Sequence, residues 1–255
     1  MWLFRLVVVG VLIMARGAPD DSNVRIEHDI HRLDDMAELA VRLGSIVTYS
    51  RYGSVLMLDG FEEGLNAWET LLLGVGASVK PSNERAYNGR VSCEVLSGTG
   101  VIPWGAFYKY LPPVNSQLLG LQTCFSIHPD VESLVFRLSC GKDPRMWHFG
   151  VLYDHVGGTL QHQWAHENYT IFATPGKLYD GSANWHNFKL VIDVNNDQYV
   201  RCYLDNEEFD MKGIAPDWEA WGFGRCIHPF LLVIGDGITT APTYFDNVIV
   251  TYNEF

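Results

Sequence analysis

The sequence predicts an all-β protein: an antiparallel β-sandwich with a short N-terminal arm and one helix. The clearest observation is residues 185–209, where every second side chain is apolar over two successive runs. That period marks strands with one buried face, and the apolar positions are Phe188, Leu190 and Ile192, followed by Val200, Cys202 and Leu204. Turn formers separate the runs at Asn195, Asn196 and Asp197.

Two further observations agree with this fold class. Short apolar runs recur along the chain with Gly, Pro and Asn between them, and only one segment has a convincing helical pattern. Many closely spaced strands without helices between them are typical of a sandwich or barrel.

The composition suits one large β domain with a small extension. The chain has 255 residues, 47% hydrophobic and 19% charged, which is enough to bury a core without metal or disulfide support. Its net charge of -12 repels phosphate backbones, so nucleic acid is excluded as a partner. Neutral glycans and metal cations remain possible partners.

The five cysteines form neither a disulfide framework nor a zinc motif, because their number is odd and no CxxC pair occurs. We expect buried free thiols at Cys93, Cys124, Cys140, Cys202 and Cys226. One bridge involving Cys226 stays open if the protein is exported.

Residues 1–18 are interpreted in two ways. Arg5, a short apolar run and the small residues after it fit a secretory signal peptide, and the run is too short to span a bilayer. The alternative is a leader created by an upstream start codon, with the natural start at Met14. Both interpretations leave this segment out of the fold, and the first places the protein outside the cell or on its surface.

Residues 19–57 are predicted to form an arm with a helix at 34–43 and a hairpin. Asp35 and Glu38 resemble a capping box, and Gly44 is a suitable stop. The hairpin joins strands at 46–49 and 55–58. The arm either packs on its own sandwich or docks on a neighbouring subunit, which would make the protein a homo-oligomer or assembly subunit.

The predicted β domain covers residues 58–255. Its expected strands lie at 75–79, 91–96, 105–110, 118–127, 133–139, 147–153, 159–164, 169–173, 230–234 and 244–252, besides those of residues 185–209.

Three segments of this domain resemble a known group. Residues 59–68 (DGFEEGLNAW), 86–95 (AYNGRVSCEV) and 244–250 (YFDNVIV) resemble, in this order, the opening strand, the next signature and the final strand of jelly-roll carbohydrate-binding modules. Residues 185–209 look like the late strands of concanavalin A-like and laminin G-like sandwiches. The resemblance implies a jelly-roll β-sandwich that binds glycans without catalysis, whereas residues 100–181 match no family pattern.

The resemblance also implies a structural Ca²⁺ where the first and last strands meet. Glu62 and Asp246 stand at the family's acidic positions, and Asp59 is a further candidate ligand. Calcium takes several oxygen ligands, which loop carbonyls near Asn88 could complete. The alternative is that these carboxylates accept backbone N–H bonds at strand ends, and Asn247 in place of a second aspartate favours that alternative.

A glycan site needs exposed aromatic faces with polar neighbours. Trp218, Trp221 and Trp104 adjoin Gly, Pro or charged residues in expected loops, and Trp147 and Trp164 lie in middle strands; these five are the candidate ligand-binding residues. Trp68 and Trp185 are assigned to the core.

No catalytic residue is predicted. The nearest carboxylate pairs are Glu207–Glu208 and Asp217–Glu219, and His162, His166 and Glu167 suggest metal ligation only loosely. Three functions therefore stay open: a carbohydrate-binding module, a structural subunit of a virion or surface layer, and a glycan hydrolase or lyase. The last would show a groove lined by a close carboxylate pair or a Tyr–His pair.

Overall fold

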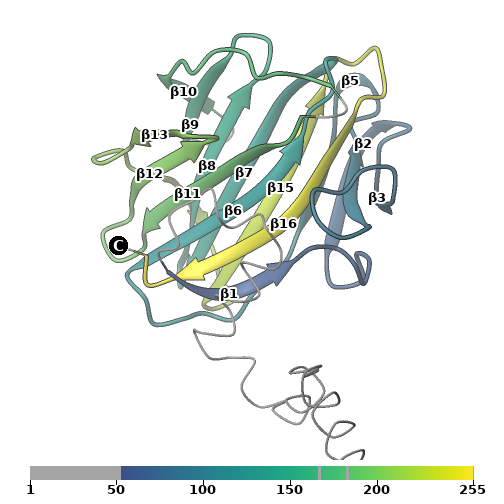
Figure 1. Cartoon of the computed structure of the whole chain (residues 1–255). Helices are drawn as coiled ribbons and strands as arrows, with labels where there is room; N and C mark the ends of the chain where they lie inside the picture. The colour runs from purple at the N-terminus through teal and green to yellow at the C-terminus, as the bar shows by residue number, and fades with distance from the viewer. Residues whose placement is uncertain (1–52, 166–167, 182–183, 255) are drawn as a thin grey trace, which may run out of the picture. The chain divides into compact units, whose positions relative to one another are not determined.

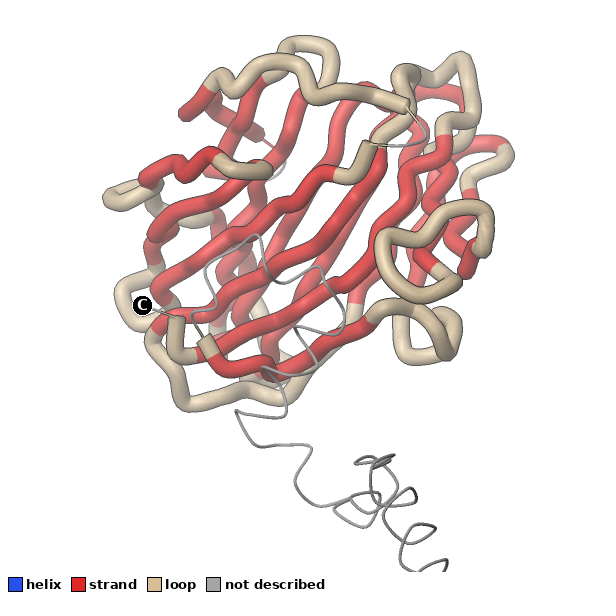
Figure 2. The backbone as a smooth tube through the Cα atoms, in the orientation of Figure 1, coloured by secondary structure: helices blue, strands red, loops and turns tan. Residues whose placement is uncertain are grey.

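The computed structural model describes residues 53–165, 168–181 and 184–254, and within them every element is a strand (Figures 1 and 2). The predicted leader, the helix at 34–43 and the strand at 46–49 lie outside the described residues. Among the described residues, no helix has the length and apolar character needed to cross a membrane.

Sheet A has the strand order β13-β12-β11-β6-β16-β4-β3, and β1 pairs with the remaining part of β16. Its strands are β1 (Ser54–Asp59), β3 (Ser78–Ser82), β4 (Ser92–Leu96), β6 (Leu118–Ser126), β11 (His186–Asp193), β12 (Gln198–Leu204), β13 (Glu207–Asp210) and β16 (Pro242–Tyr252).

Sheet B has the order β10-β9-β8-β7-β15-β5-β2, and β14 pairs with β8. Its strands are β2 (Glu69–Val75), β5 (Thr99–Tyr108), β7 (Val131–Lys142), β8 (Arg145–Asp154), β9 (Thr159–Ala165), β10 (Asn168–Ala173), β14 (Asp217–Ala220) and β15 (Cys226–Gly235). All these pairings are antiparallel, so the predicted antiparallel sandwich is confirmed.

One core fills the space between the sheets. Phe136 of sheet B stacks on Phe188 of sheet A, with ring centroids 4.1 Å apart, and Phe125, Phe107 and Phe245 pack around this pair. Trp68 belongs to the core as predicted. Trp185 does not, because it is half-buried and packs on Tyr87 instead.

The predicted hairpin of residues 185–209 is confirmed as β11 and β12, with one correction. β12 contains a bulge at Val200, because Val191 pairs with Arg201 and Ile192 pairs with Tyr199. As a result Tyr199, and not Val200, points into the core. The strand predicted at 75–79 is wrong, because Gly76 turns the chain there with a positive φ of 79°.

The opening and closing segments of the sandwich lie side by side. Asp59 in β1 pairs with Val248 in β16, and Phe61 and Val248 are both fully buried in the core. All five cysteines are free thiols, as predicted, with four buried and Cys226 partly exposed. Burial raises the pKa of the Cys140 thiol to about 12, which leaves it unreactive.

Candidate functional site

The outer face of sheet B carries ionisable and aromatic side chains in register. His148 of β8, Ser139 of β7 and His228 of β15 are direct cross-strand neighbours. These side chains point away from the core, because their neighbours Leu138, Phe149 and Ile227 point into it. The adjacent row contains Arg137, Phe230 and Tyr108.

Aromatic rings gather where β5 leads on to Tyr110. The Tyr110 ring stacks on His228, with centroids 4.6 Å apart and planes within 10°. Trp221 stacks on the Tyr110 ring at 6.3 Å, and Phe223 meets Trp221 edge-on at 4.9 Å. Tyr110 is 47% exposed and Phe223 86% exposed, so this stack presents ring surface to solvent.

A glycine makes room for Trp221. A Cβ on Gly141 would lie 2.9 Å from Trp221 Nε1, so any larger residue there would displace the indole. The indole N–H donates to the Gly224 carbonyl at 2.7 Å, and the Trp221 backbone N–H donates to the Pro144 carbonyl at 2.7 Å. The ring position is therefore fixed both by the neighbouring Gly224 and by Gly141 and Pro144, which lie where β7 turns into β8.

Polar groups surround the stack. His148 Nδ1 lies 2.9 Å from Ser139 Oγ, and His148 Nε2 lies 3.2 Å from Glu219 Oε1. The Arg137 guanidinium lies 4.0 Å above the Phe230 ring. We call Tyr108, Tyr110, Arg137, His148, Trp221 and His228 the aromatic end of sheet B.

The histidines of this end are held neutral. Burial, and then the charges of Arg137 and His148, lowers the pKa of His228 to about 3. Both ring nitrogens of His228 are buried without a hydrogen-bond partner. Burial also lowers the pKa of His148. The hydrogen bond to Glu69 raises the pKa of Tyr108 to about 12.

The neutral His228 predicts a loss of stability in acid. Its folded-state pKa lies below the unfolded value of about 6.5, so the unfolded chain binds the proton first and stability falls as the pH drops from 6.5 toward 3. Between pH 7 and 5 we expect His228 to account for roughly 2 kcal/mol of the lost free energy of unfolding. His228→Phe keeps a ring against Tyr110 and should remove that share; urea unfolding of both proteins at the two pH values checks it. An unchanged pH dependence in the variant would contradict this.

The structure separates the five predicted tryptophans. Trp221 joins the aromatic end of sheet B. Trp218 lies on β14, not in a loop, and is 48% exposed. The Arg145 guanidinium lies 4.1 Å from the centre of the Trp218 ring. The Trp147 ring lies 6.3 Å from the Trp218 ring and is half-buried against the core. Trp104 lies in the middle of β5 and not in a loop, six residues before Tyr110 and away from the aromatic end. Trp164 lies on β9, and its side chain is outside the described residues.

Sequence reasoning missed Tyr108, Tyr110, Arg137 and His228. The alternation in β15, where His228, Phe230 and Leu232 share one side, was a usable signal for their orientation. That His228 lies against Tyr110 depends on the pairing of β15 with β5, which no local pattern specifies.

Apart from Glu219, which contacts His148, the other acidic and histidine candidates do not converge. Glu207 and Glu208 are exposed in β13, and Asp217 and Glu219 lie on β14, where a loop was expected. His162 is half-buried on β9, while His166 and Glu167 lie outside the described residues. Within the described ranges, no group of three or more His, Cys, Asp or Glu side chains is placed to bind a metal.

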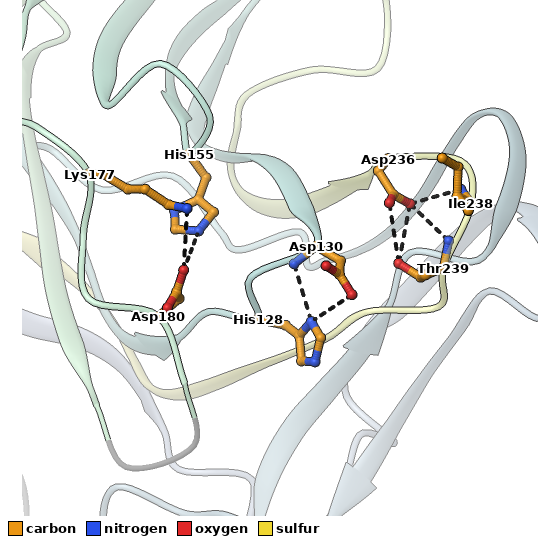
Figure 3. A network of polar contacts seen from close by, with 8 residues as sticks. All are labelled: His128, Asp130, His155, Lys177, Asp180, Asp236, Ile238 and Thr239. Atoms are coloured by element: carbon orange, nitrogen blue, oxygen red, sulfur yellow. Dashed lines mark hydrogen bonds and ion pairs between the residues drawn. The ribbon is translucent and has the colours of Figure 1, made fainter.

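A hollow of about 650 Å³ opens at the opposite end of sheet B, near the turn that precedes β7. Asp130, Glu132, Asp154 and Asp236 line it. Figure 3 shows that the acids here serve local turns: Asp236 accepts the N–H groups of Ile238 and Thr239, and Asp130 contacts His128. Asp130 and Asp236 therefore stabilise the turns to which they belong.

The predicted metal carboxylates Glu62 and Asp246 both accept hydrogen bonds from the loop of residues 83–91, next to the pairing of β1 with β16. Asp246 is fully buried; its Oδ2 accepts the N–H groups of Tyr87 and Asn88 at 2.8 and 3.0 Å, and its Oδ1 accepts that of Asn247 at 2.7 Å. Glu62 Oε1 accepts the N–H groups of Arg90 and Val91. Asp59 is used otherwise, because its two oxygens accept the Phe61 N–H and the Trp68 indole N–H.

Two observations at this place fit a cation. Burial raises the pKa of Asp246 to about 6, and the charge of Glu62 adds to the rise, so the ionised carboxylate lacks a compensating charge. The side-chain amide nitrogens of Asn88 and Asn247 are buried without an acceptor. Rotating each amide by 180° would put an oxygen in that position, which is the ligand that Ca²⁺ prefers.

Comparisons with known proteins agree with the architecture. No protein-family model matches the chain, and no curated protein matches it. Among solved structures, it is similar to the cellulose induced protein Cip1, with a TM-score of 0.54 at 12% identity over 76% of this chain and 96% of that one. The fold is a jelly-roll, concanavalin A-like β-sandwich.

The chain is also similar to two further solved structures. One is the carbohydrate esterase vb_24B_21 of the Shiga toxin-encoding bacteriophage phi24B, with a TM-score of 0.50 at 14% identity over 79% of this chain and all of that one. The other is the carbohydrate recognition domain of Emp47p, with a TM-score of 0.48 at 11% identity over 74% and 89% of the two chains. At such identities, the similarities to Cip1 and to the phi24B esterase show the fold alone.

Proposed function

We propose that this protein binds a glycan, without catalysis, at the aromatic end of sheet B, and acts outside the cell or on a surface. The observation that carries the proposal is the exposed stack of Phe223, Trp221 and Tyr110 beside Glu219 and Arg137. Sugar C–H faces pack on such rings, while hydroxyl groups exchange hydrogen bonds with charged and amide neighbours. The two structures of similar fold, a cellulose induced protein and a carbohydrate esterase, support a carbohydrate as the ligand.

The charge distribution favours a neutral glycan. The net charge of -12 disfavours polyanionic ligands. Carboxylates at the site, namely Glu69, Asp217 and Glu219, are suited to accept hydrogen bonds from sugar hydroxyls.

Catalysis is the second candidate, because the structure does bring a Tyr–His pair, Tyr110 and His228, to this face. Efficient general acids and bases have pKa values near the working pH. The pKa of His228, at about 3, lies far below neutrality, and burial raises the pKa of Tyr110 above its ordinary value. The pair is therefore better suited to forming a binding surface than to transferring protons.

The test measures retention on neutral polysaccharides by affinity electrophoresis in gels containing cellulose derivatives, xylan or galactan. Retention of the full chain on at least one of them is expected, and Tyr110→Ala and Trp221→Ala should each weaken binding about tenfold or more. Tyr179→Ala is the matched control, because this ring is 82% exposed outside the site. Absence of retention on all matrices, or equal effects of all three variants, would contradict the proposal and favour a structural role.

We also propose a structural Ca²⁺ held by Glu62 and Asp246, with Asn88 and Asn247 as amide ligands. When bound, the ion would supply positive charge to the junction of the first and last strands. Saturating Ca²⁺ should raise the thermal midpoint by about 5–10 °C over the chelated protein. Glu62→Gln should lose most of that shift, whereas Asp236→Asn should keep it. Equal midpoints with calcium and with chelator would count against a bound ion.

A further inference from the structure

The outer face of sheet A is buried although it faces away from the core. Val191 of β11 is 0% exposed and Ile249 of β16 is 2% exposed, yet neither belongs to the core between the sheets. Their sequence neighbours Leu190 and Val250 do belong to it, so Val191 and Ile249 point to the other side. Gln122 of β6 pairs with Ile249 and is buried on the same face.

Described residues cover only the margins of this face. The loop that contains Tyr87 covers Asp246 at one margin. At the other, Glu254 folds back over Gly120, where an added Cβ would lie 2.8 Å from its Oε1. Between them, Figure 1 shows the middle of β11, β6 and β16 side by side, with no labelled element over them.

Few parts of the chain remain that could cover the middle of this face. Besides residues 1–52, only 166–167, 182–183 and 255 lie outside the described residues, and these are too short to cover three strands. Residues 43–52 directly precede Gly53, which adjoins the buried face: a Cβ there would lie 2.7 Å from Glu254 Oε1 and 3.1 Å from the Tyr252 carbonyl oxygen. Ten residues reach about 33 Å when extended, enough to cross several strands.

We propose that residues 43–52 dock on the outer face of sheet A of their own chain, over Val191, Gln122 and Ile249. The segment LGSIVTYSRY contains Ile46, Val47 and two tyrosines, which match the apolar centre of the face. It has no acidic residue to repel Glu254, and Arg51 supplies a donor of complementary charge. Glu254 Oε2 is buried without a hydrogen-bond partner and provides an acceptor for it.

This assignment answers which face of the sandwich is available to other molecules. With sheet A covered by its own chain, the outer face of sheet B remains for a ligand. The proposal does not depend on glycan binding, since it concerns the opposite sheet.

The test is disulfide trapping in the full chain. Val191→Cys is combined with Ile46→Cys in one variant and with Val47→Cys in another, because adjacent residues of an extended segment point to opposite sides. At least one pair should form a disulfide at monomer mass, seen as a faster band on a non-reducing gel. The control pairs each arm cysteine with Val156→Cys, a 75% exposed residue in the turn between β8 and β9 of sheet B, and should show no such band.

Other outcomes would overturn the proposal. A disulfide-linked product at dimer mass would indicate that a second copy covers the face. If neither pair gives the faster, disulfide-linked band at monomer mass, residues 43–52 lie elsewhere. Near-ultraviolet circular dichroism establishes that each variant is folded. In a variant that does not fold, Ile249→Cys replaces Val191→Cys as the acceptor position.

Discussion

Replacing Asp246 by alanine is expected to lower the free energy of unfolding by about 3–5 kcal/mol. The carboxylate is fully buried and accepts three backbone N–H groups, from Tyr87, Asn88 and Asn247. Alanine leaves these donors without an acceptor and releases the loop that Tyr87 and Asn88 belong to. Urea unfolding, followed by tryptophan fluorescence, measures the loss.

Two matched variants sharpen this expectation. Asp246→Asn keeps one acceptor oxygen and should cost less than alanine. Asp236→Ala removes an exposed carboxylate that also accepts backbone N–H groups, from Ile238 and Thr239, and should cost no more than about 1 kcal/mol. A loss at Asp246 no larger than that at Asp236 would contradict the burial argument.

The second large effect is expected at the ion pair of Lys189 and Glu254. Their charged atoms are 2.8 Å apart and both side chains are almost fully buried. Lys189→Met removes the positive charge that lies 2.8 Å from the buried Glu254 carboxylate, so we expect a loss of about 3–5 kcal/mol in the free energy of unfolding. Thermal and urea unfolding of the full chain measure it.

The double variant Lys189→Met/Glu254→Gln separates pairing from packing. Removing both charges should restore most of the stability lost in the single variant, because no uncompensated charge remains. Lys177→Met is the surface control: Lys177 pairs with Asp180 at 3.4 Å but is half-exposed, and its loss should cost less than about 1 kcal/mol. No recovery in the double variant would mean that Lys189 stabilises the fold through its packing.

Periodicity predicted the layers well because it reports which side of a strand a residue faces. Phe188, Leu190 and Ile192 were predicted to be buried and are in the core. The same alternation directs Lys189 and Val191 outward, and both do point away from the core, yet both are buried. Alternation specifies a direction, and it contains no information on what covers the outer side.

The candidate site was predicted only in part, for a related reason. Trp221 and Trp218 are aromatic residues among polar residues and glycine. The neighbouring sequence shows these surroundings directly, so both could be predicted as candidates. The stack of Trp221 on Tyr110, and of Tyr110 on His228, joins segments more than a hundred residues apart through strand pairing. Such a site becomes visible only when the strand order is known.

The carboxylates show what a family resemblance can and cannot predict. It brought Glu62 and Asp246 together across the whole sequence, and the structure places both around the loop of residues 83–91. Asp59 was only a further candidate near these positions, and its oxygens instead accept the Phe61 and Trp68 N–H groups. The difference lies in local turn geometry, since Phe61 has a positive φ of 60°.

The pairing of β1 with β16 has a consequence for engineering. Ser54 lies opposite Tyr252, so the sandwich begins and finishes at neighbouring points. A short peptide joining them would let the chain be reopened at an exposed turn such as that of Asn206, giving a circular permutant with every strand still in place.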